Sequence, residues 1–412
     1  MHTNANVLLA RQPIFDRKLN TIGYELLYRP IPSDDEGWQN LSGDLATNEV
    51  LVSAFDNIGI EHVTAGCPAY INFTEHWLKN PPPFNPESVV VEILEHIEAN
   101  PENIAAVKKL RNQGYSIALD DYLGDPAQDP FLPHVDILKL DVPAFNSITE
   151  IKHLIQQKGR DEFLWLAEKV EAQEEYAACA EAGCDYFQGY FFSRPANIYG
   201  DQISSNKRII LELIIALQDP DINLQQLEQL LSQDPSLSFR LLKLVNSAAF
   251  NQQSKVESLQ RAITIAGIEQ IRTWVTMLSF GKLEDKPQEL CKQSLQRAYF
   301  FQSLALSIPG MASDTAFTAG LLSNLDAYFD LPLAQLLSKI HLHTDINTAL
   351  INRSGKLGFI FTTVLDMEKG QWHKIRWPLW KKTGLEASKI ESYYWQSIKE
   401  AERLLDSNFS DH

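Results

Sequence analysis

Residues 116–141 read SIALDDYLGDPAQDPFLPHVDILKLD, and this stretch indicates the fold of the first half of the chain most clearly. It contains two short apolar runs, Ser116–Asp120 and Ile137–Leu140. Both runs have the length and aliphatic composition of strands buried in a sheet. The first ends at the Asp120–Asp121 pair, and the second carries Lys139 and ends before Asp141. The stretch therefore predicts two successive strands with charged side chains near their carboxyl ends.

Similar runs occur on both sides of this stretch, separated by amphipathic segments. Pro101–Asn112 predicts a helix, because Asn100 can cap it, a proline opens it and Gly114 follows its end. Strands that alternate with helices are typical of an α/β fold around a parallel sheet. The predicted strands, rich in β-branched and aromatic residues, are Val7–Arg11, Thr21–Tyr28, Ala69–Phe73, Ser88–Ile93, Ser116–Asp120, Ile137–Leu140, Phe163–Ala167 and Tyr186–Tyr190.

Nearly every predicted strand ends in or just before a carboxylate, an amide or a lysine. One such residue alone is more often structural than catalytic, because loops are solvated. In a parallel barrel, however, the carboxyl ends of all strands lie on one face and converge on one pocket. A (β/α)8 barrel with a common polar mouth is the simplest explanation of the series. Its members are Glu25, Asn72, Glu92, Asp120, Asp121, Lys139, Asp141, Glu168 and Gln188.

The residue types of this set indicate a metal-dependent reaction of a phosphate ester. Glu, Asn and Asp oxygens without Cys or His select Mg²⁺ or Mn²⁺ over zinc. The adjacent Asp120 and Asp121 suit two cations that share a ligand, which is the arrangement that cleaves phosphodiesters. Lys139 is suited to orient the water or to offset phosphate charge.

The second half of the chain has a different pattern. Residues 196–206 are polar and contain glycine, which predicts a domain junction. Beyond it the apolar residues recur at the helical period, so we expect a barrel over 1–200 and an all-helical domain over 201–412. The clearest predicted helices are Arg208–Gln218, Leu224–Leu231, Ser236–Asn246, Ser258–Ala266 and Gln270–Phe280.

Composition narrows the function classes. The 412 residues carry a formal charge of -17, which argues against a general nucleic-acid binder. An acidic site that takes a phosphate ligand needs a bound cation to reverse the local charge. No run is long and apolar enough to span a bilayer, and the first residues lack the features of a secretory signal, so we expect a cytoplasmic protein.

The first half resembles the EAL family of cyclic di-GMP phosphodiesterases. Each motif is weak alone, but their common order is strong evidence. The motifs are GYELLYR at Gly23–Arg29, INFT at Ile71–Thr74, EILE at Glu92–Glu95, DDY at Asp120–Tyr122, KLD at Lys139–Asp141, AEKVE at Ala167–Glu171 and QGYFFSRP at Gln188–Pro195.

The resemblance implies a role for each matching residue and two ions of Mg²⁺ or Mn²⁺. One ion would be held by Glu25, Asn72, Glu92 and Asp120, and the second by Asp120, Asp121 and Glu168. The catalytic set would be Lys139, Glu168 and Asp121, with Lys139 beside the attacking water. Arg29, Gln188 and Asp141 would contact cyclic di-GMP. Glu95 would tie down the loop that follows the two aspartates.

Two departures from the family pattern stand beside these matches. The loop after Asp121 reads YLGDPAQDP, where the family has a Gly-Thr-Gly-Tyr-Ser type of segment. Lys169 stands where the family has glycine. A cyclic di-GMP receptor without turnover, and a scaffold that binds no nucleotide, are therefore the alternatives to a phosphodiesterase.

The second half resembles the HDOD domain through Asp234–Phe250 and Arg261–Val275. Catalytic HD hydrolases place a metal-binding His-Asp pair after a Gly-Leu-Leu run, whereas this chain has Ser323 and Asn324 there. The resemblance implies no hydrolysis in this domain and a role in sensing or docking. A signalling protein bound through the HDOD domain and a homodimer are the protein partners that remain open.

Overall fold

The computed structural model describes residues 7–30, 60–194, 205–219, 221–232, 234–246, 256, 258–283 and 285–409. The contacts divide the chain into two compact units. The first comprises Met1–Phe192 together with Leu365–Ser392, and the second comprises Ser193–Val364 together with Tyr393–His412. The junction predicted near residue 200 lies outside the described residues and stays a prediction.

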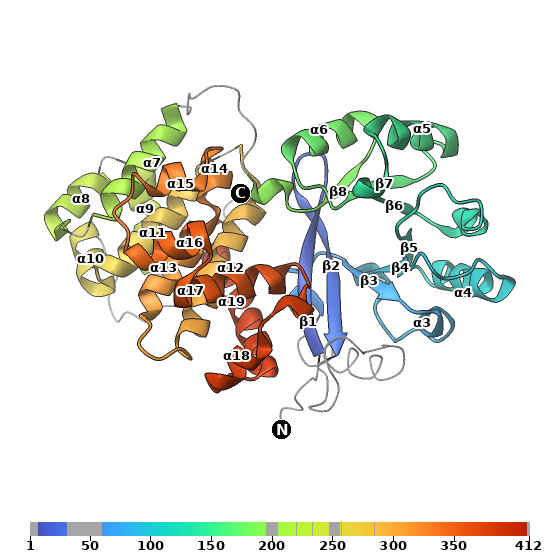
Figure 1. The fold of residues 1–412 in the computed structure, drawn as a ribbon. Helices are drawn as coiled ribbons and strands as arrows, with labels where there is room; N and C mark the ends of the chain where they lie inside the picture. The colour runs from blue at the N-terminus through green and yellow to red at the C-terminus, as the bar shows by residue number, and fades with distance from the viewer. Residues whose placement is uncertain are drawn as a thin grey trace. The chain divides into compact units, whose positions relative to one another are not determined.

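The first unit contains a closed barrel whose eight strands follow one another in chain order, as the ribbon in Figure 1 shows. This confirms the predicted barrel. Its strands are β1 (Val7–Phe15), β2 (Thr21–Pro30), β3 (Ala69–Phe73), β4 (Val89–Ile93), β5 (Ser116–Leu119), β6 (Ile137–Asp141), β7 (Leu164–Glu168) and β8 (Tyr186–Gln188).

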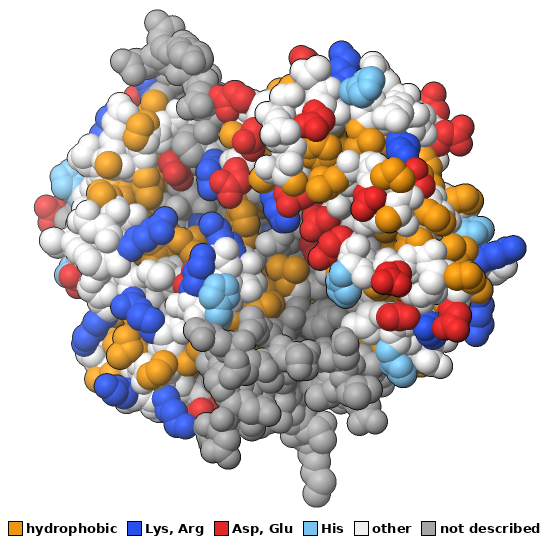
Figure 2. Space-filling view, turned by 45° about the vertical axis from the view of Figure 1, so that its right-hand side comes forward, with side chains coloured by type: hydrophobic (Ala, Val, Ile, Leu, Met, Phe, Trp, Pro, Cys, Tyr) orange, Lys and Arg blue, Asp and Glu red, His pale blue; other side chains and the backbone are white. Residues whose placement is uncertain are grey.

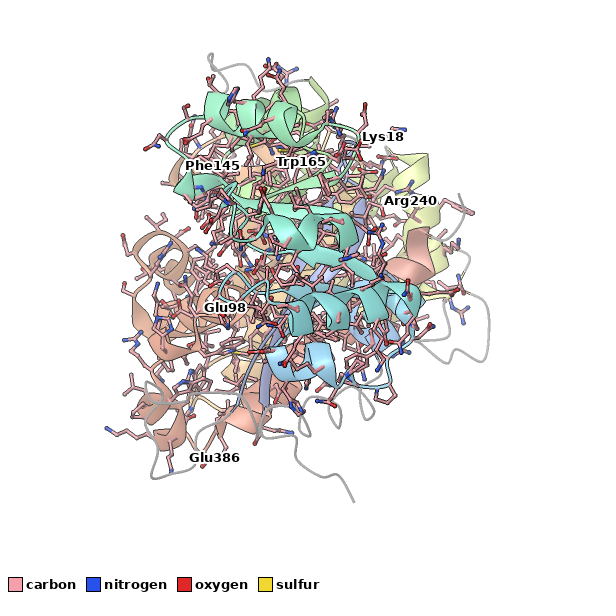
Figure 3. All side chains as sticks on the ribbon, turned by 90° about the vertical axis from the view of Figure 1, so that its right-hand side faces the viewer. Lys18, Glu98, Phe145, Trp165, Arg240 and Glu386 are labelled. Atoms are coloured by element: carbon pink, nitrogen blue, oxygen red, sulfur yellow. The ribbon has the colours of Figure 1, made fainter. Side chains whose placement is uncertain are left out.

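Strand β1 runs antiparallel to both β2 and β8, so the expectation that all strands of the barrel are parallel is wrong for this strand. The reason is the short turn after Phe15, which leaves no room for the crossover that a parallel neighbour needs. Asp16 closes this turn, since its Oδ1 accepts hydrogen bonds from the backbone N–H groups of Lys18 (2.8 Å) and Asn20 (2.9 Å). Lys18, labelled in Figure 3, is exposed in the turn.

An apolar layer fills the inside of the barrel. Its members include Ile14, Tyr70, Val90, Ala118, Ile137 and Leu166. Gly23 completes the layer on β2, where an added Cβ would lie only 2.6 Å from Cε2 of Tyr70. Because side chains on a strand alternate between two faces, the residue two positions along from each of these also points inward. Those positions carry the polar residues described below.

Helices cover the outside of the barrel between successive strands. They are α3 (Glu75–Lys79), α4 (Pro101–Asn112), α5 (Ile148–Lys158) and α6 (Gln173–Ala182). Helix α4 has the predicted bounds, and Oδ1 of Asn100 caps it by accepting from the backbone N–H of Asn103 at 2.9 Å. Outward-facing strand residues pack under this layer, as does the fully buried Trp165 of β7, which is labelled in Figure 3.

The rest of the described chain is helical, which confirms the all-α second half. The five clearest predicted helices are present within three residues of their predicted bounds. The helices of the second half are α7 (Ser205–Leu217), α8 (Leu224–Ser232), α9 (Pro235–Val245), α10 (Leu259–Ala266), α11 (Ile268–Phe280), α12 (Gln288–Ala305), α13 (Ser313–Leu321), α14 (Leu325–Phe329), α15 (Leu333–Leu337), α16 (Thr344–Asn352), α17 (Gly355–Glu368), α18 (Trp377–Lys382) and α19 (Ala387–Phe409). One short helix, α2 (Ile60–Val63), precedes β3 in the first half.

Among these described helices, none combines the length and the hydropathy that crossing a bilayer requires.

Candidate active site

The barrel carries a polar layer next to its apolar layer. Each member lies two residues along the chain from an apolar or glycine position, on the same strand or, for Asp120, directly after the end of β5, so both point inward. On β2 to β8 the polar residue comes after its apolar counterpart, and on the antiparallel β1 it comes before. The layer consists of Gln12, Glu25, Asn72, Glu92, Asp120, Lys139, Glu168 and Gln188.

Lys139 lies at the centre of this layer with no solvent exposure. Its Nζ is 2.6 Å from Glu92 Oε1, 2.8 Å from Asp120 Oδ1 and 2.9 Å from Glu168 Oε1. Glu25 Oε1 is more distant, at 3.9 Å. The barrel thus gathers four carboxylates from four strands around one ammonium group.

Burial and mutual charge shift the ionisation of this cluster. Burial alone would lower the pKa of Lys139, but the surrounding carboxylates outweigh it and raise the pKa well above its usual value. The pKa of Glu92 is also raised, because complete burial and the neighbouring carboxylates outweigh the attraction of Lys139. Carboxylates crowded in this way favour an added cation, which relieves both desolvation and repulsion.

The donors of the cluster fit a divalent cation such as Mg²⁺ or Mn²⁺. Every potential ligand is an oxygen atom, and no Cys or His belongs to the polar layer. Oε2 of Glu92 is buried and has no hydrogen-bond partner. A buried carboxylate oxygen left in this state calls for a ligand that supplies positive charge. The ammonium group of Lys139 marks where the cluster concentrates negative potential.

A second group of carboxylates lies beside the first. Glu95, Asp120 and Asp121 each offer an oxygen, and these oxygens lie within 4.8 Å of one another. In Figure 2, Asp and Glu side chains are exposed together on the barrel unit, in contrast to the buried Glu92. Burial and the proximity of Asp120 raise the pKa of Asp121, although Lys169 opposes them.

The backbone at the two aspartates is held by the neighbouring strands. The N–H of Asp120 donates to the carbonyl of Ile93 (2.9 Å), and the N–H of Tyr122 donates to the carbonyl of Lys139 (2.8 Å). Between them Asp121 adopts φ +43°, a conformation that L residues rarely take. The turn presents consecutive aspartates to the mouth instead of sending the second one to the outer face.

Amide side chains fix the orientation of Glu25. Nδ2 of Asn72 donates to Oε1 of Glu25 at 3.3 Å. Nε2 of Gln188 donates to Oε2 of Glu25 and, at 3.1 Å, to Oε1 of Gln12. Gln12 was not among the predicted site residues. The sequence signal for Gln12 is an amide side chain within an apolar run. Because β1 is antiparallel, Gln12 comes before the apolar-layer residue of its strand, whereas on the other strands the polar residue comes after it.

The loop after Asp121 differs from the family pattern and has its own anchor. Asp129 Oδ1 accepts hydrogen bonds from the hydroxyl of Tyr122 (2.8 Å) and from Nζ of Lys158 (2.7 Å). Nε2 of Gln128 donates to the carbonyl of Glu95 at 3.4 Å, so Glu95 contacts the loop through its backbone. These contacts replace the glycine-rich segment with a loop tied to α5.

Two further predicted positions belong to the strands of the barrel. Asp141 ends β6, and its Oδ2 accepts from Nζ of Lys169 at 2.6 Å. Arg29 belongs to β2, but its side chain lies outside the described residues. Glu25, Asp120, Asp121, Glu168 and Gln188 line a cavity of about 440 Å³, whose lining also includes Lys169. Sites for small organic ligands are typically of this size.

In the second unit, Ser323 and Asn324 are buried in a polar network instead of facing solvent. Nη1 of Arg297 donates to Oγ of Ser323 at 3.2 Å and also to Oδ1 of Asn324. Nδ2 of Asn324 donates to Oε1 of Gln293 at 2.9 Å. The guanidinium group of Arg297 therefore lies against the two residues that stand where catalytic HD hydrolases have their metal-binding pair.

Comparison with known protein families agrees with this geometry. The EAL domain model matches residues 53–195, and the HDOD domain model matches residues 203–338. The EAL match begins after Glu25, and the structure places Glu25 of β2 in the same polar layer as the matched residues. The two matches follow each other along the chain, and Leu365–Ser392 lies beyond both of them.

Two relatives are similar to nearly the whole chain. The uncharacterized protein YuxH of Bacillus subtilis (strain 168) is 32% identical over 97% of this chain and 99% of its own length. The cyclic di-GMP phosphodiesterase CdgJ of Vibrio cholerae serotype O1 is 33% identical over 89% of this chain and 86% of its own length. The crystal structure of an EAL domain protein from Listeria monocytogenes EGD-e is 20% identical, covers 47% of this chain and 89% of that one, and has a TM-score of 0.37.

Proposed function

The chain belongs to the family of proteins in which an EAL domain precedes an HDOD domain, and from this premise we propose that it is a metal-dependent phosphodiesterase that hydrolyses cyclic di-GMP to linear pGpG. One observation carries the proposal. Four carboxylates converge on the buried Lys139 at the barrel mouth, and Oε2 of Glu92 there has no hydrogen-bond partner. The relative CdgJ is named for the same activity.

We assign two divalent cations, Mg²⁺ or Mn²⁺, to this mouth. One would take its ligands from Glu25, Asn72, Glu92 and Asp120, and the other from Asp120, Asp121 and Glu168. Support comes from the oxygen-only donor set and from the close approach of the Asp120 and Asp121 carboxylates. Glu95, whose oxygen lies near the same pair, is a further candidate ligand besides its role at the loop.

The chemistry divides between these cations and the side chains of the chain. When bound, divalent cations at such a site lower the pKa of a water molecule and offset the charge of the phosphate. The ammonium of Lys139 is fixed by several carboxylates, so it is suited to donate a hydrogen bond to the attacking water. We assign Glu168 and Asp121 as acceptors that orient this water. Hydrolysis adds one water across one phosphodiester bond and opens the ring.

The nucleotide would bind in the cavity above the polar layer. We assign contacts with it to Gln188, Asp141 and Arg29. Gln188 already lines the cavity and is oriented by Gln12 and Glu25. The net negative charge of the mouth makes binding of a phosphate ester dependent on the cations. Affinity for cyclic di-GMP should therefore fall when a chelator removes them.

For the helical unit we propose a docking or sensing role without hydrolysis. The cation of Arg297 next to Ser323 and Asn324 disfavours a divalent ion at that place. The partner of the helical unit would be another signalling protein, or a second copy of this chain, in the cytoplasm.

The proposal is tested with purified protein, Mn²⁺ or Mg²⁺, and cyclic di-GMP. Linear pGpG should form and should disappear in the variant Glu25→Gln, which keeps the shape of the side chain but removes its charge. Glu150→Gln, on the exposed face of α5, is the matched control and should keep the wild-type rate. Tight nucleotide binding without product in the wild-type protein would contradict the proposal in favour of a receptor.

A further inference from the structure

Lys169 follows the metal-ligand candidate Glu168 directly and has a backbone conformation that its side chain does not favour. Its φ is +56°, in the left-handed region. Glycine adopts this region without cost, whereas other L residues store strain there. Strain of this kind persists where the side chain makes a compensating contact, so the contacts of Lys169 indicate what it does.

The ammonium group of Lys169 reaches the carboxylates beside the double aspartate. Its Nζ donates to Asp141 Oδ2 at 2.6 Å and lies 3.6 Å from Asp121 Oδ1. The lysine is held at Asp141 but remains half exposed, with 55% of its side chain accessible. A positive charge is therefore tethered at the rim, near the carboxylate of Asp121.

The charge of Lys169 lies where the second divalent ion would take its ligands, because Asp121 is one of the carboxylates assigned to that ion. An ammonium group and a divalent cation relieve the same excess of negative charge, so they compete for it. The cluster around Lys139 is different, because Lys139 has no solvent exposure and cannot swing away.

We propose that Lys169 is a tethered cation that competes with the second divalent ion for Asp121 and weakens binding of that ion relative to the first. The inference rests on the proposed metal-dependent function. The first ion would take its ligands from Glu25, Asn72, Glu92 and Asp120, whereas the ion pairs of Lys169 are with Asp121 and Asp141. Occupancy of the second position then depends on the concentration of free cation, and Lys169 sets the concentration range over which this position fills.

The test is an isothermal titration of the full-length, chelator-treated protein with Mn²⁺ in the absence of nucleotide. Lys169→Gln removes the charge at nearly constant length and keeps the unfavourable φ. Lys169→Arg keeps the charge. Lys152→Gln, an exposed lysine on α5, is the matched control. We expect two binding steps in the wild-type protein, the second weaker than the first.

In Lys169→Gln the second step should tighten by about tenfold, the effect of removing one nearby charge at a partly exposed site. Lys169→Arg and Lys152→Gln should retain the wild-type isotherm. Lys169→Gly should match Lys169→Gln in Mn²⁺ affinity and exceed it in melting temperature, because glycine also removes the strain. This second readout separates charge from backbone conformation.

Two outcomes would overturn the inference, and they differ from each other. Two steps whose affinities do not change in Lys169→Gln would reject competition by Lys169 and leave the metal-dependent function standing. Absence of any Mn²⁺ binding by the wild-type protein would reject the proposed metal site itself and the inference with it.

Discussion

Lys139 places an ammonium group without solvent exposure among four carboxylates. Removing one partner of a buried ionic cluster leaves the others uncompensated, and this costs more than the pairing itself contributes. Positive charge therefore stabilises the cluster, whether it comes from Lys139 or from a metal ion bound beside it. This dual role links the stability of the barrel to its chemistry.

Lys139→Met should lower the free energy of unfolding by about 3 kcal/mol in the presence of a chelator. Added Mn²⁺ should recover more stability in this variant than in the wild-type protein, because it supplies the missing charge. Urea denaturation with and without Mn²⁺ measures both effects. Lys79→Met removes an exposed lysine paired with Glu75 and Glu102 and should change little. Equal losses in the two variants would contradict this account of the cluster.

At the residue scale, the sequence predicted most of the polar layer because each residue follows an apolar run on a strand. Glu25, Glu92, Asp120, Lys139 and Glu168 all lie where this rule placed them. Gln12 was missed because the rule assumes parallel strands, and β1 runs the other way. The contact of Lys169 with Asp141 was not predictable either, since it depends on a φ that the side chain disfavours.

The loop between β5 and β6 is anchored to its neighbours although its sequence departs from the family pattern. The family's glycine-rich segment is absent, yet Asp129 joins the loop to α5 through Lys158 and to the strand end through Tyr122. Burial acts to raise the pKa of Asp129, but the hydrogen bonds from Lys158 and Tyr122 outweigh it and leave the pKa below its usual 3.8.

Asp129→Asn should therefore destabilise the protein by about 1 kcal/mol at neutral pH, where the carboxylate is ionised. A carboxyl whose pKa is lowered by folding stabilises the fold above its unfolded-state pKa and loses this contribution as the pH falls through the folded-state pKa. The difference in the free energy of unfolding between wild type and variant should thus stay constant down to weakly acidic pH and shrink below pH 3.8. Urea denaturation across pH measures it.

Asp161→Asn, at an exposed aspartate after α5 that is not part of this anchor, provides the control and should change the free energy of unfolding little. A loss of stability in Asp129→Asn that persists unchanged in acid would mean that the anchor does not depend on charge.

At the element scale, the strands were predictable because short aliphatic runs alternate with helices that have clear start and end signals. Helix α4 matches its prediction because Asn100, Pro101 and Gly114 mark its limits in the sequence. The direction of β1 was not predictable from its composition. It follows from the length and hydrogen bonding of the turn at Asp16, which the apolar pattern does not encode.

At the scale of the whole molecule, the division into units differs from the order of the chain. Leu365–Ser392 clusters with the barrel although it follows most of the helical unit. Its Trp380 is fully buried and Trp372 is 5% exposed. The periodicity of the sequence indicates that this segment is helical, but it does not reveal which unit a helix joins.

Trp380→Ala should destabilise the barrel unit, to which we assign Mn²⁺ binding, by about 3 kcal/mol or more. In calorimetry, the transition that Mn²⁺ shifts should move to lower temperature, and the other transition should remain. Leu241→Ala, a fully buried leucine of α9, is the control for the helical unit and should show the reverse pattern. A Trp380→Ala variant that lowers only the Mn²⁺-insensitive transition would contradict the assignment of this segment to the barrel.

We propose that the polar layer of the barrel is the active site of a cation-dependent hydrolase. Its most direct test follows cyclic di-GMP by chromatography with the purified full-length protein, first with chelator and then with Mn²⁺. The account predicts linear pGpG only when Mn²⁺ is present, and none from Glu25→Gln under the same conditions. Bound but intact cyclic di-GMP with Mn²⁺ present, or equal turnover by Glu25→Gln, would contradict it.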